Sequence, residues 1–456
     1  MQKETTSTSN IRTSDCCNPL TWFSLACCIT YAFSELLFPG LGKVGEAGLL
    51  SVTLISFVFF GLRNPALLTP FILLGVSVLV QVTAWTVSFR VREYGFEPET
   101  TPRIDLLGKW FLFLFFALWL PRKSSGVPMM WAASIIGFFL MPWTKGLGIR
   151  ELQLAINNQR IDVGTMNAQH AAMFSGILLL GSLSLFIRSS TAVTHKKILT
   201  GLATFTTLAS ITLLYATQTR GVWLGTAIAS TSIIALYLYF SLKNKSFDAP
   251  SKLLITFMAT LIITACLIAI NSNLNNRIDK ESRSLTLALQ GKIEEMPLDS
   301  TGIRLRSWYF ALPFLSERPW LGWGPDGSKL IIQESNALPP DLKLQFGHLH
   351  NTYLDIVAQY GLFGLALYLA LLGWLILRII KAFRAGVLPL SAYLFGIAFF
   401  IYWTIVNMFE SYMLFSSGKY AFTVVYAGLI SLTISSSATN QRPTTHHLLN
   451  QGNYES

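Results

Sequence analysis

Two histidines and an asparagine stand in the stretch "QFGHLHNTYLDIVAQYGLFG" at residues 345–364. A histidine side chain accepts a proton near neutral pH, so His348 and His350 are candidates for a general base. In an extended segment the two side chains share a face, whereas in a helix they point apart, so we expect only one to be catalytic. Asp355 lies about 140° from His350 around a helix, which makes it a poor orienting partner. The competing interpretation is a pair of interfacial histidines at the start of an apolar helix.

Arginine is the second residue type that could take part in binding or catalysis. Arg220, in "YATQTRGVWLGTAIAS", lies between two apolar runs, at a place where membrane topology gives no reason for a cation. The planar guanidinium group binds phosphate through two parallel hydrogen bonds, so an anion clamp is the functional interpretation. The alternative is a side chain that reaches toward lipid headgroups.

A second arginine-bearing stretch reads "STGIRLRSWYFALPFLSERPWLGWGPDG". Its spacing predicts a helix that begins near Ser300 or Thr301 and is stopped by Pro319. One face of this helix carries an apolar stripe made of Leu305, Trp308, Tyr309, Leu312 and Leu315. The stripe predicts a helix that lies on, or dips into, the outer membrane interface.

The arginines of this predicted helix differ in direction. Arg304 lies one turn from Trp308, on the flank of the stripe, whereas Arg306 points to the opposite side. We therefore favour Arg304 as a site residue and keep Arg306 open between a site residue and a surface charge. Arg160 is a further candidate in another outer loop, with Asn167 at the start of the following helix.

Motifs for nucleotides and metals are missing from the sequence. It has no Walker-type glycine-rich loop, which leaves ATP hydrolysis by this chain unsupported. It also has no DxD cluster on the outer side to gather Mg²⁺ near phosphates. Its five cysteines show no metal-type spacing, and we expect no disulfide. We therefore expect no metal and no cofactor, with arginines alone neutralising any phosphate.

Composition predicts the elements that must position these residues. The chain has 456 residues, of which 52% are hydrophobic and only 12% are charged. About twelve apolar runs approach the length that spans a bilayer, which is typical of an all-α integral membrane protein. The formal net charge of +11 could suggest nucleic acid. Because the basic residues lie in short loops between runs, topology explains them, and we expect membrane lipid and no nucleic acid as partner.

The predicted spans alternate with loops of opposite charge character. Their approximate limits are Leu20–Phe38, Ala47–Gly61, Pro65–Phe89, Leu107–Leu120, Val127–Trp143, Ala168–Ile187, Ile198–Thr217, Gly221–Phe240, Leu253–Ile270, Thr352–Ile379, Leu388–Asn407 and Phe422–Ser435. Lysine and arginine clusters fall on one side if both termini are cytoplasmic. The predicted parts are a cytoplasmic segment 1–19, nine spans in 20–270, an outer loop 271–350 with the amphipathic helix, three spans in 351–435, and a disordered cytoplasmic tail 436–456.

The candidate histidines and arginines also belong to an ordered set of sequence motifs. His350 and Asn351, nine further residues and then "GLFG" at 361–364 resemble the signature of the O-antigen ligase and polymerase family of bacterial integral-membrane glycosyltransferases. The arginine, tryptophan and "PxxGxG" pattern upstream, the "TRG" at Arg220, and more weakly Arg160 with Asn167, resemble further elements of that family. Together they cover the chain from about Arg160 to Gly364.

This resemblance implies a C-type glycosyltransferase (GT-C) architecture in the bacterial inner membrane, with the active site and the long loop on the periplasmic side. The donor would be a glycan on undecaprenyl pyrophosphate, and in the ligase branch the acceptor is a sugar hydroxyl of the lipid A core. The essential histidine of the family maps onto His350, and its arginines map onto Arg220 and Arg304. The transfer would invert the anomeric centre without metal or ATP.

Alternatives within and outside the family remain open. A polymerase would add the same donor to another lipid-linked glycan, and a protein O-oligosaccharyltransferase would use a serine or threonine hydroxyl. A secondary transporter also fits twelve spans, but transporters place ionisable residues near the midplane. Here the candidate residues gather on the outer side, which favours surface chemistry on a lipid substrate.

Overall fold

The computed structural model describes residues 19–60, 67–89, 100–120, 125–191, 194–243, 282–336 and 338–435, and within these ranges it contains helices and no strand. The helices are α1 (Pro19–Ser34), α2 (Pro39–Phe60), α3 (Leu68–Ser88), α4 (Asp105–Gly108), η3 (Lys109–Phe111), α5 (Leu112–Trp119), α6 (Gly126–Thr144), α7 (Ile149–Ile156), α8 (Ala168–Thr191), α9 (Lys196–Thr217), α10 (Arg220–Lys243), η4 (Ile293–Glu295), α13 (Ser300–Glu317), α14 (Gly327–Glu334), α15 (Pro340–Lys343), α16 (Thr352–Arg384), α17 (Leu390–Val406), η5 (Tyr412–Leu414) and α18 (Ser416–Ser435).

Every predicted span except Leu253–Ile270, which lies outside the described residues, falls on one or more of these helices. Within the described residues, six helices are long and apolar enough to cross a membrane, namely α3, α6, α8, α9, α10 and α16, while α1 and α17 are shorter apolar helices. The all-helical membrane fold is thus supported. The number of twelve spans and the sides of the loops stay predictions.

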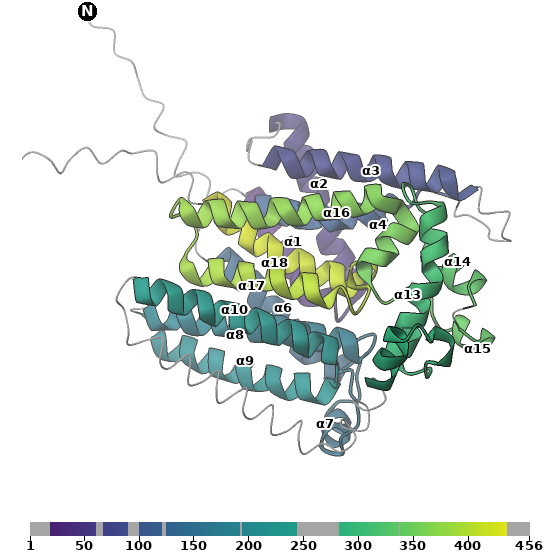
Figure 1. The fold of residues 1–456 in the computed structure, drawn as a ribbon. Helices are drawn as coiled ribbons and strands as arrows, with labels where there is room; N and C mark the ends of the chain where they lie inside the picture. Colours follow the sequence, from purple (N-terminus) through teal and green to yellow (C-terminus); the bar gives the residue numbers. More distant parts are fainter. Residues whose placement is uncertain are drawn as a thin grey trace, which may run out of the picture.

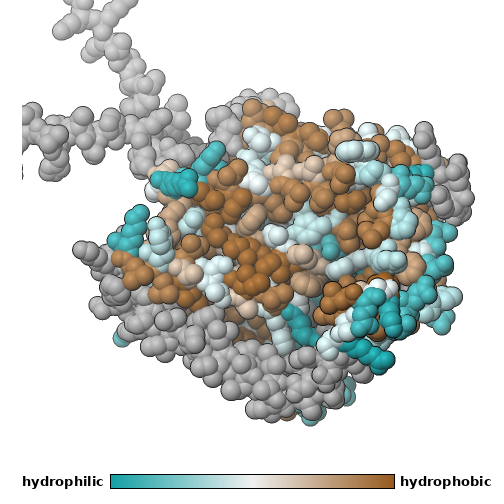
Figure 2. All heavy atoms as spheres, viewed as in Figure 1, coloured by the Kyte–Doolittle hydropathy of each residue, from teal (hydrophilic) through white to brown (hydrophobic). Residues whose placement is uncertain are grey.

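The long helices lie roughly side by side, and the short helices α13, α14 and α15 gather at one end of the bundle (Figure 1). Helix α10 packs against α8 and α17, and α16 packs against α3 and α17. Aromatic side chains such as Trp403, Phe399 and Tyr426 are fully buried between these helices. Figure 2 shows apolar side chains across the middle of one face and hydrophilic ones toward its two sides, as expected for a bilayer-spanning bundle.

Helix α13 covers one end of the bundle as a cap. It begins where predicted, because the carboxylate of Asp299 accepts hydrogen bonds from the backbone N–H groups of Thr301 at 3.0 Å and Gly302 at 2.7 Å. Of the predicted stripe, Trp308 packs inward, whereas Tyr309 and Leu312 are 52% and 54% exposed, because the helix turns its Ala311 side toward α14 and α16. A position of the exposed side chains on the membrane interface stays a prediction.

Helix α16 is interrupted at Gly361, whose φ of 64° and ψ of −164° are not helical. The segment after α13 enters this break and pairs with it through backbone hydrogen bonds. The N–H groups of Leu362 and Trp323 donate to the carbonyls of Pro319 and Ala358 at 2.7 and 2.8 Å. A Cβ on Gly361 would lie 2.2 Å from the carbonyl oxygen of Trp320. The "GLFG" and "PxxGxG" motifs are therefore the two halves of one joint.

We expect Gly361→Ala to destabilise the folded chain by roughly 2 kcal/mol or more, because alanine is strained at this φ and collides with the opposing backbone. The check is the thermal unfolding midpoint of the purified protein in detergent. Gly373→Ala is the matched control on the same helix, since a Cβ there meets nothing within 4 Å. An equal unfolding temperature for the two variants would contradict the claim that the pairing of these two segments requires glycine at position 361.

Candidate active site

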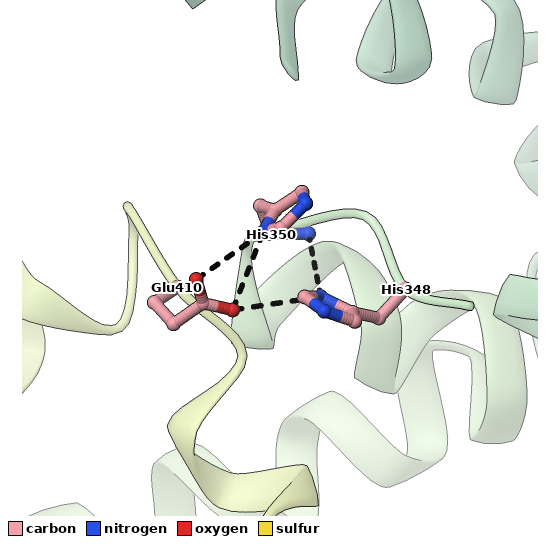
Figure 3. A group of neighbouring side chains, drawn as sticks. All are labelled: His348, His350 and Glu410. Atoms are coloured by element: carbon pink, nitrogen blue, oxygen red, sulfur yellow. Dashed lines mark hydrogen bonds and ion pairs between the residues drawn. The ribbon is translucent and has the colours of Figure 1, made fainter. Parts of the chain in front are cut away.

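His350 lies immediately before α16 and faces an acid from a distant part of the chain (Figure 3). Its Nδ1 lies 3.3 Å from Oε1 and 3.2 Å from Oε2 of Glu410, in the connection that follows α17. The carboxylate favours the tautomer with the ring proton on Nδ1, which leaves Nε2 free to accept a proton. His350 has a left-handed backbone with a φ of 53°, a conformation that histidine adopts more readily than most residues.

His348 has a different role in the same cluster. Its Nδ1 accepts a hydrogen bond from the backbone N–H of His350 at 3.3 Å, which assigns its own ring proton to Nε2. Burial lowers the pKa of His348 to about 4, and the charges of His350 and Arg304 act in the same direction. His348 is thus a neutral acceptor that supports the backbone of His350.

Burial raises the pKa of the Glu410 carboxyl, but the hydrogen bond from His350, the charges of His350 and His348, and the backbone N–H of Ser411 outweigh it and hold the pKa at about 2. Because this value lies below the ordinary 4.5, the carboxylate stabilises the folded chain above pH about 4.5 and loses this contribution as the pH falls through 2. Glu410 therefore stays ionised beside His350 at all physiological pH values.

Polar residues of α16 hold the histidine segment in place. The Asn351 side chain caps the helix by accepting from the N–H of Tyr353 at 3.0 Å and of Leu354 at 3.2 Å. Thr352 donates its hydroxyl to Asn407 at 2.6 Å, which ties α16 to the end of α17 just before Glu410. Asn351 therefore fixes the start of α16 next to His350, and a direct part in the chemistry stays a prediction.

Asp355 pairs away from His350, as predicted. Its carboxylate accepts from the backbone N–H of Leu349 at 2.9 Å and from the hydroxyl of Ser411. Since Leu349 lies between the two histidines and Ser411 follows Glu410, this buried acid fixes both halves of the cluster.

The cap helix brings Trp308 and Arg304 to the same place. The indole N–H of Trp308 donates to the carbonyl of Leu349 at 2.7 Å, so this tryptophan orients the histidine segment. Arg304 lies close enough for its charge to act on His348. Its Nε is buried and has no hydrogen-bond partner among the described residues. A donor of this kind calls for an acceptor that enters the site from outside.

Arg306 points away from this cluster. Its Nη1 donates to the backbone carbonyl of Glu294 at 3.1 Å. This contact fits the expectation of opposite directions for the two arginines and gives Arg306 a role in holding the loop.

Arg160 holds the segment that leads into α10, whose first residue is Arg220. Arg160 donates to the carbonyl of Thr217 at 2.9 Å and to the hydroxyl of Thr219 at 3.1 Å, directly before Arg220. Gly221 lets this helix end approach the segment that carries Glu410, because a Cβ there would lie 2.7 Å from the ring of Phe409. The motif glycine thus places the start of α10 beside the residue that precedes Glu410.

The charges of Arg304 and Arg160 both act on the hydroxyl of Tyr412. Burial raises the pKa of this hydroxyl, and the guanidinium groups of Arg304 and Arg160 oppose the rise. Both arginines are therefore within electrostatic reach of the residue that follows Glu410 and Ser411. The site combines one imidazole and carboxylate pair with several guanidinium groups at one end of the bundle.

Three residues of the cluster were missed in the sequence, namely Glu410, Ser411 and His170. Glu410 is a lone acid in the apolar stretch "WTIVNMFESYMLF", so the reasoning that singled out Arg220 could have found it. His170 is fully buried at the start of α8, with its Nδ1 2.7 Å from the Ser417 hydroxyl. It has no such local signal, because only the packing of α8 against α18 places it beside Tyr412.

The structure brings together three side chains that could hold a metal ion, while the expectation of no metal stays a prediction. The sequence showed no metal-type motif, yet His348, His350 and Glu410 each offer a ligand atom, and these atoms lie within 4.8 Å of one another. The third donor comes from far along the chain, so no local spacing could have revealed the set.

The fold and the site define a multi-pass, all-helical membrane protein with a histidine and carboxylate pair among arginines. The O-antigen ligase family model matches residues 205–369, which confirms the motif resemblance and supports membership of the chain in the O-antigen ligase and polymerase family. This family implies a glycosyltransferase-like enzyme. The matched segment includes Arg220, Arg304 and His350, whereas Arg160 and Glu410 lie outside it.

The chain is also similar to an uncharacterized protein of Haemophilus influenzae, with 32% identity over 148 residues. The alignment covers 32% of this chain and 35% of that protein. The chain thus matches about a third of the length of this relative, which adds nothing about substrates.

Proposed function

We propose that this chain is an O-antigen ligase of the bacterial inner membrane. It would move O-antigen polysaccharide from undecaprenyl pyrophosphate to a sugar hydroxyl of the lipid A core, with its active site facing the periplasm. The observation that carries the proposal is the pairing of His350 with Glu410 beside Arg304, whose buried Nε has no partner within the described chain.

The acceptor hydroxyl needs a base, because its own pKa is far above neutral. In the proposed mechanism Nε2 of His350 takes the hydroxyl proton. The Nδ1–H group of His350 stays hydrogen-bonded to the Glu410 carboxylate, which stabilises the imidazolium that forms. The oxygen attacks the anomeric carbon as the bond to the pyrophosphate breaks on the opposite face. The product is therefore inverted.

The leaving pyrophosphate gains negative charge as it departs. Fixed guanidinium groups stabilise such charge without a metal ion, because they are already oriented before the reaction. Arg304 and Arg220 are assigned to this role, with Arg160 supporting the start of α10. The lipid-linked donor is itself activated, so no nucleotide is needed.

The test is reconstitution of the purified protein with lipid-linked O-antigen and rough lipopolysaccharide, without ATP or metal. A ligase produces a ladder of glycan on the core. Longer glycans on the lipid carrier would indicate the polymerase branch instead. If the donor crossed the vesicle membrane and no new covalent product formed, the protein would be a transporter.

Glu410→Gln should lower transfer about tenfold or more, because the amide keeps the shape but loses the charge that stabilises the imidazolium. The measurement is the transfer rate at one fixed pH. A rate within about twofold of that of the unsubstituted chain would show that Glu410 has only a packing role.

A cysteine at Leu344, which is 85% exposed just before the histidine segment, tests the side of the membrane. In a background without the five native cysteines, we expect a membrane-impermeant thiol reagent to label it in intact spheroplasts. Labelling only after lysis would put the loop in the cytoplasm and exclude the periplasmic site.

A further inference from the structure

The cluster around His350 has the geometry of a zinc site as well as that of a base. Oε1 of Glu410 lies 3.3 Å from Nδ1 of His350 and 3.5 Å from Nδ1 of His348 (Figure 3). In a tetrahedral Zn²⁺ site with bonds of about 2.0–2.1 Å, neighbouring ligand atoms lie about 3.3–3.4 Å apart. Both spacings from Oε1 are close to this value, and all three ligand atoms lie within 4.8 Å of one another. The ion would replace the backbone N–H of His350 as the partner of Nδ1 of His348.

The donor set matches the preferences of zinc. Two imidazole nitrogens and one carboxylate oxygen are borderline ligands of the kind that catalytic zinc sites use, with a fourth position left for water. The Glu410 side chain is only 2% exposed and is fixed by the N–H of Ser411 at 2.9 Å. The two histidine side chains are 17% and 12% exposed, so an ion can reach them from solvent.

Two charges near the cluster set the strength of binding. Glu410 offsets one of the two positive charges of the ion, whereas the guanidinium group of Arg304 acts on the same imidazole and opposes it. Binding should therefore be weaker than at a closed structural zinc site, and it should reverse with a chelator.

We propose that Zn²⁺ binds to His348, His350 and Glu410 and inhibits transfer. The proposal rests on the proposed function, in which Nε2 of His350 is the base. A neutral imidazole carries one ring proton, and when Nδ1 binds the ion that proton moves through water from Nδ1 to Nε2. Nε2 then has no lone pair for the acceptor hydroxyl. At the same time the Glu410 carboxylate binds the ion and no longer accepts a hydrogen bond from the His350 ring. The base and the carboxylate that supports it are therefore both lost.

The experiment uses the full chain without a polyhistidine tag, in a His446→Ala/His447→Ala background that removes the histidine pair near the end of the sequence. Co²⁺ is the spectroscopic probe, because tetrahedral coordination gives intense visible bands. We expect one Co²⁺ per chain, displacement by Zn²⁺, and loss of the bands in His348→Ala and in Glu410→Gln.

Transfer is measured in parallel with metal-free protein. Saturating Zn²⁺ should lower the rate of the unsubstituted chain at least tenfold, and EDTA should restore it. The residual rate of His348→Ala should change less than twofold, because this variant keeps the base but loses a ligand.

Absent Co²⁺ binding, bands that persist in both variants, or binding without inhibition would each overturn the zinc proposal. The proposed function would fail separately, through absent transfer by the metal-free protein.

Discussion

His350→Ala is expected to lower transfer by about a hundredfold or more, the usual scale for the loss of a general base. Donor binding should survive, because Arg304 and Arg220, the residues proposed to hold the pyrophosphate, lie on other helices. His348→Ala should cost less, since His348 supports the backbone of His350 through a single hydrogen bond. The measurement is the single-turnover rate, with donor affinity determined separately.

The backbone of His350 needs its own control. Its φ of 53° is unfavourable for alanine, so a loss of activity could arise from strain instead of chemistry. His350→Asn resolves this ambiguity, because asparagine tolerates the left-handed region but cannot act as the base. We expect His350→Asn to be as inactive as His350→Ala and to retain the unfolding temperature of the unsubstituted protein. An active His350→Asn would assign catalysis to another group.

Arg304→Lys should lower transfer by roughly a hundredfold, the scale on which a preorganised donor to a developing anion contributes. Lysine keeps the positive charge but loses the planar fork and the buried Nε–H, so the pyrophosphate would be held by a single mobile ammonium group. Arg220→Lys should also lower transfer, because Arg220 is the first residue of α10, next to Gly221, which approaches the segment that carries Glu410.

Arg306→Lys is the matched control on the same cap helix. Arg306 donates to a loop carbonyl at 3.1 Å and faces away from the histidines. We therefore expect the transfer rate of Arg306→Lys to stay within about threefold of that of the unsubstituted chain. Equal losses for Arg304→Lys and Arg306→Lys would mean that the cap helix as a whole was disturbed and that the anion clamp lies elsewhere.

Much of this fold was predictable because apolar run length and helix caps are local properties of a sequence. The start of α13 at Ser300 and the start of α16 at Thr352 follow from side chains within three residues, namely Asp299 and Asn351. The inward position of Trp308, which shares its stripe with the exposed Tyr309 and Leu312, was not predictable from the stripe alone. It depends on which neighbours the cap helix meets.

The site divides in the same way. His350, Arg220 and Arg304 stand in recognisable local patterns, so the sequence could nominate them. Glu410 lies 60 residues beyond His350, and only the packing of α16 against α17 brings the two together. The proposed zinc ligand set depends on that long-range contact, which no pattern of local spacing could have revealed.

The most direct test of the central claim follows both products of one turnover. Purified protein would be mixed with labelled lipid-linked O-antigen and rough lipopolysaccharide, without nucleotide or metal, and core-linked glycan and free undecaprenyl pyrophosphate would be quantified together. The account predicts that they appear in a one-to-one ratio and at the same rate, and that His350→Asn slows both at least a hundredfold. Glycan that remains on the lipid carrier, or a one-to-one transfer that His350→Asn leaves intact, would contradict it.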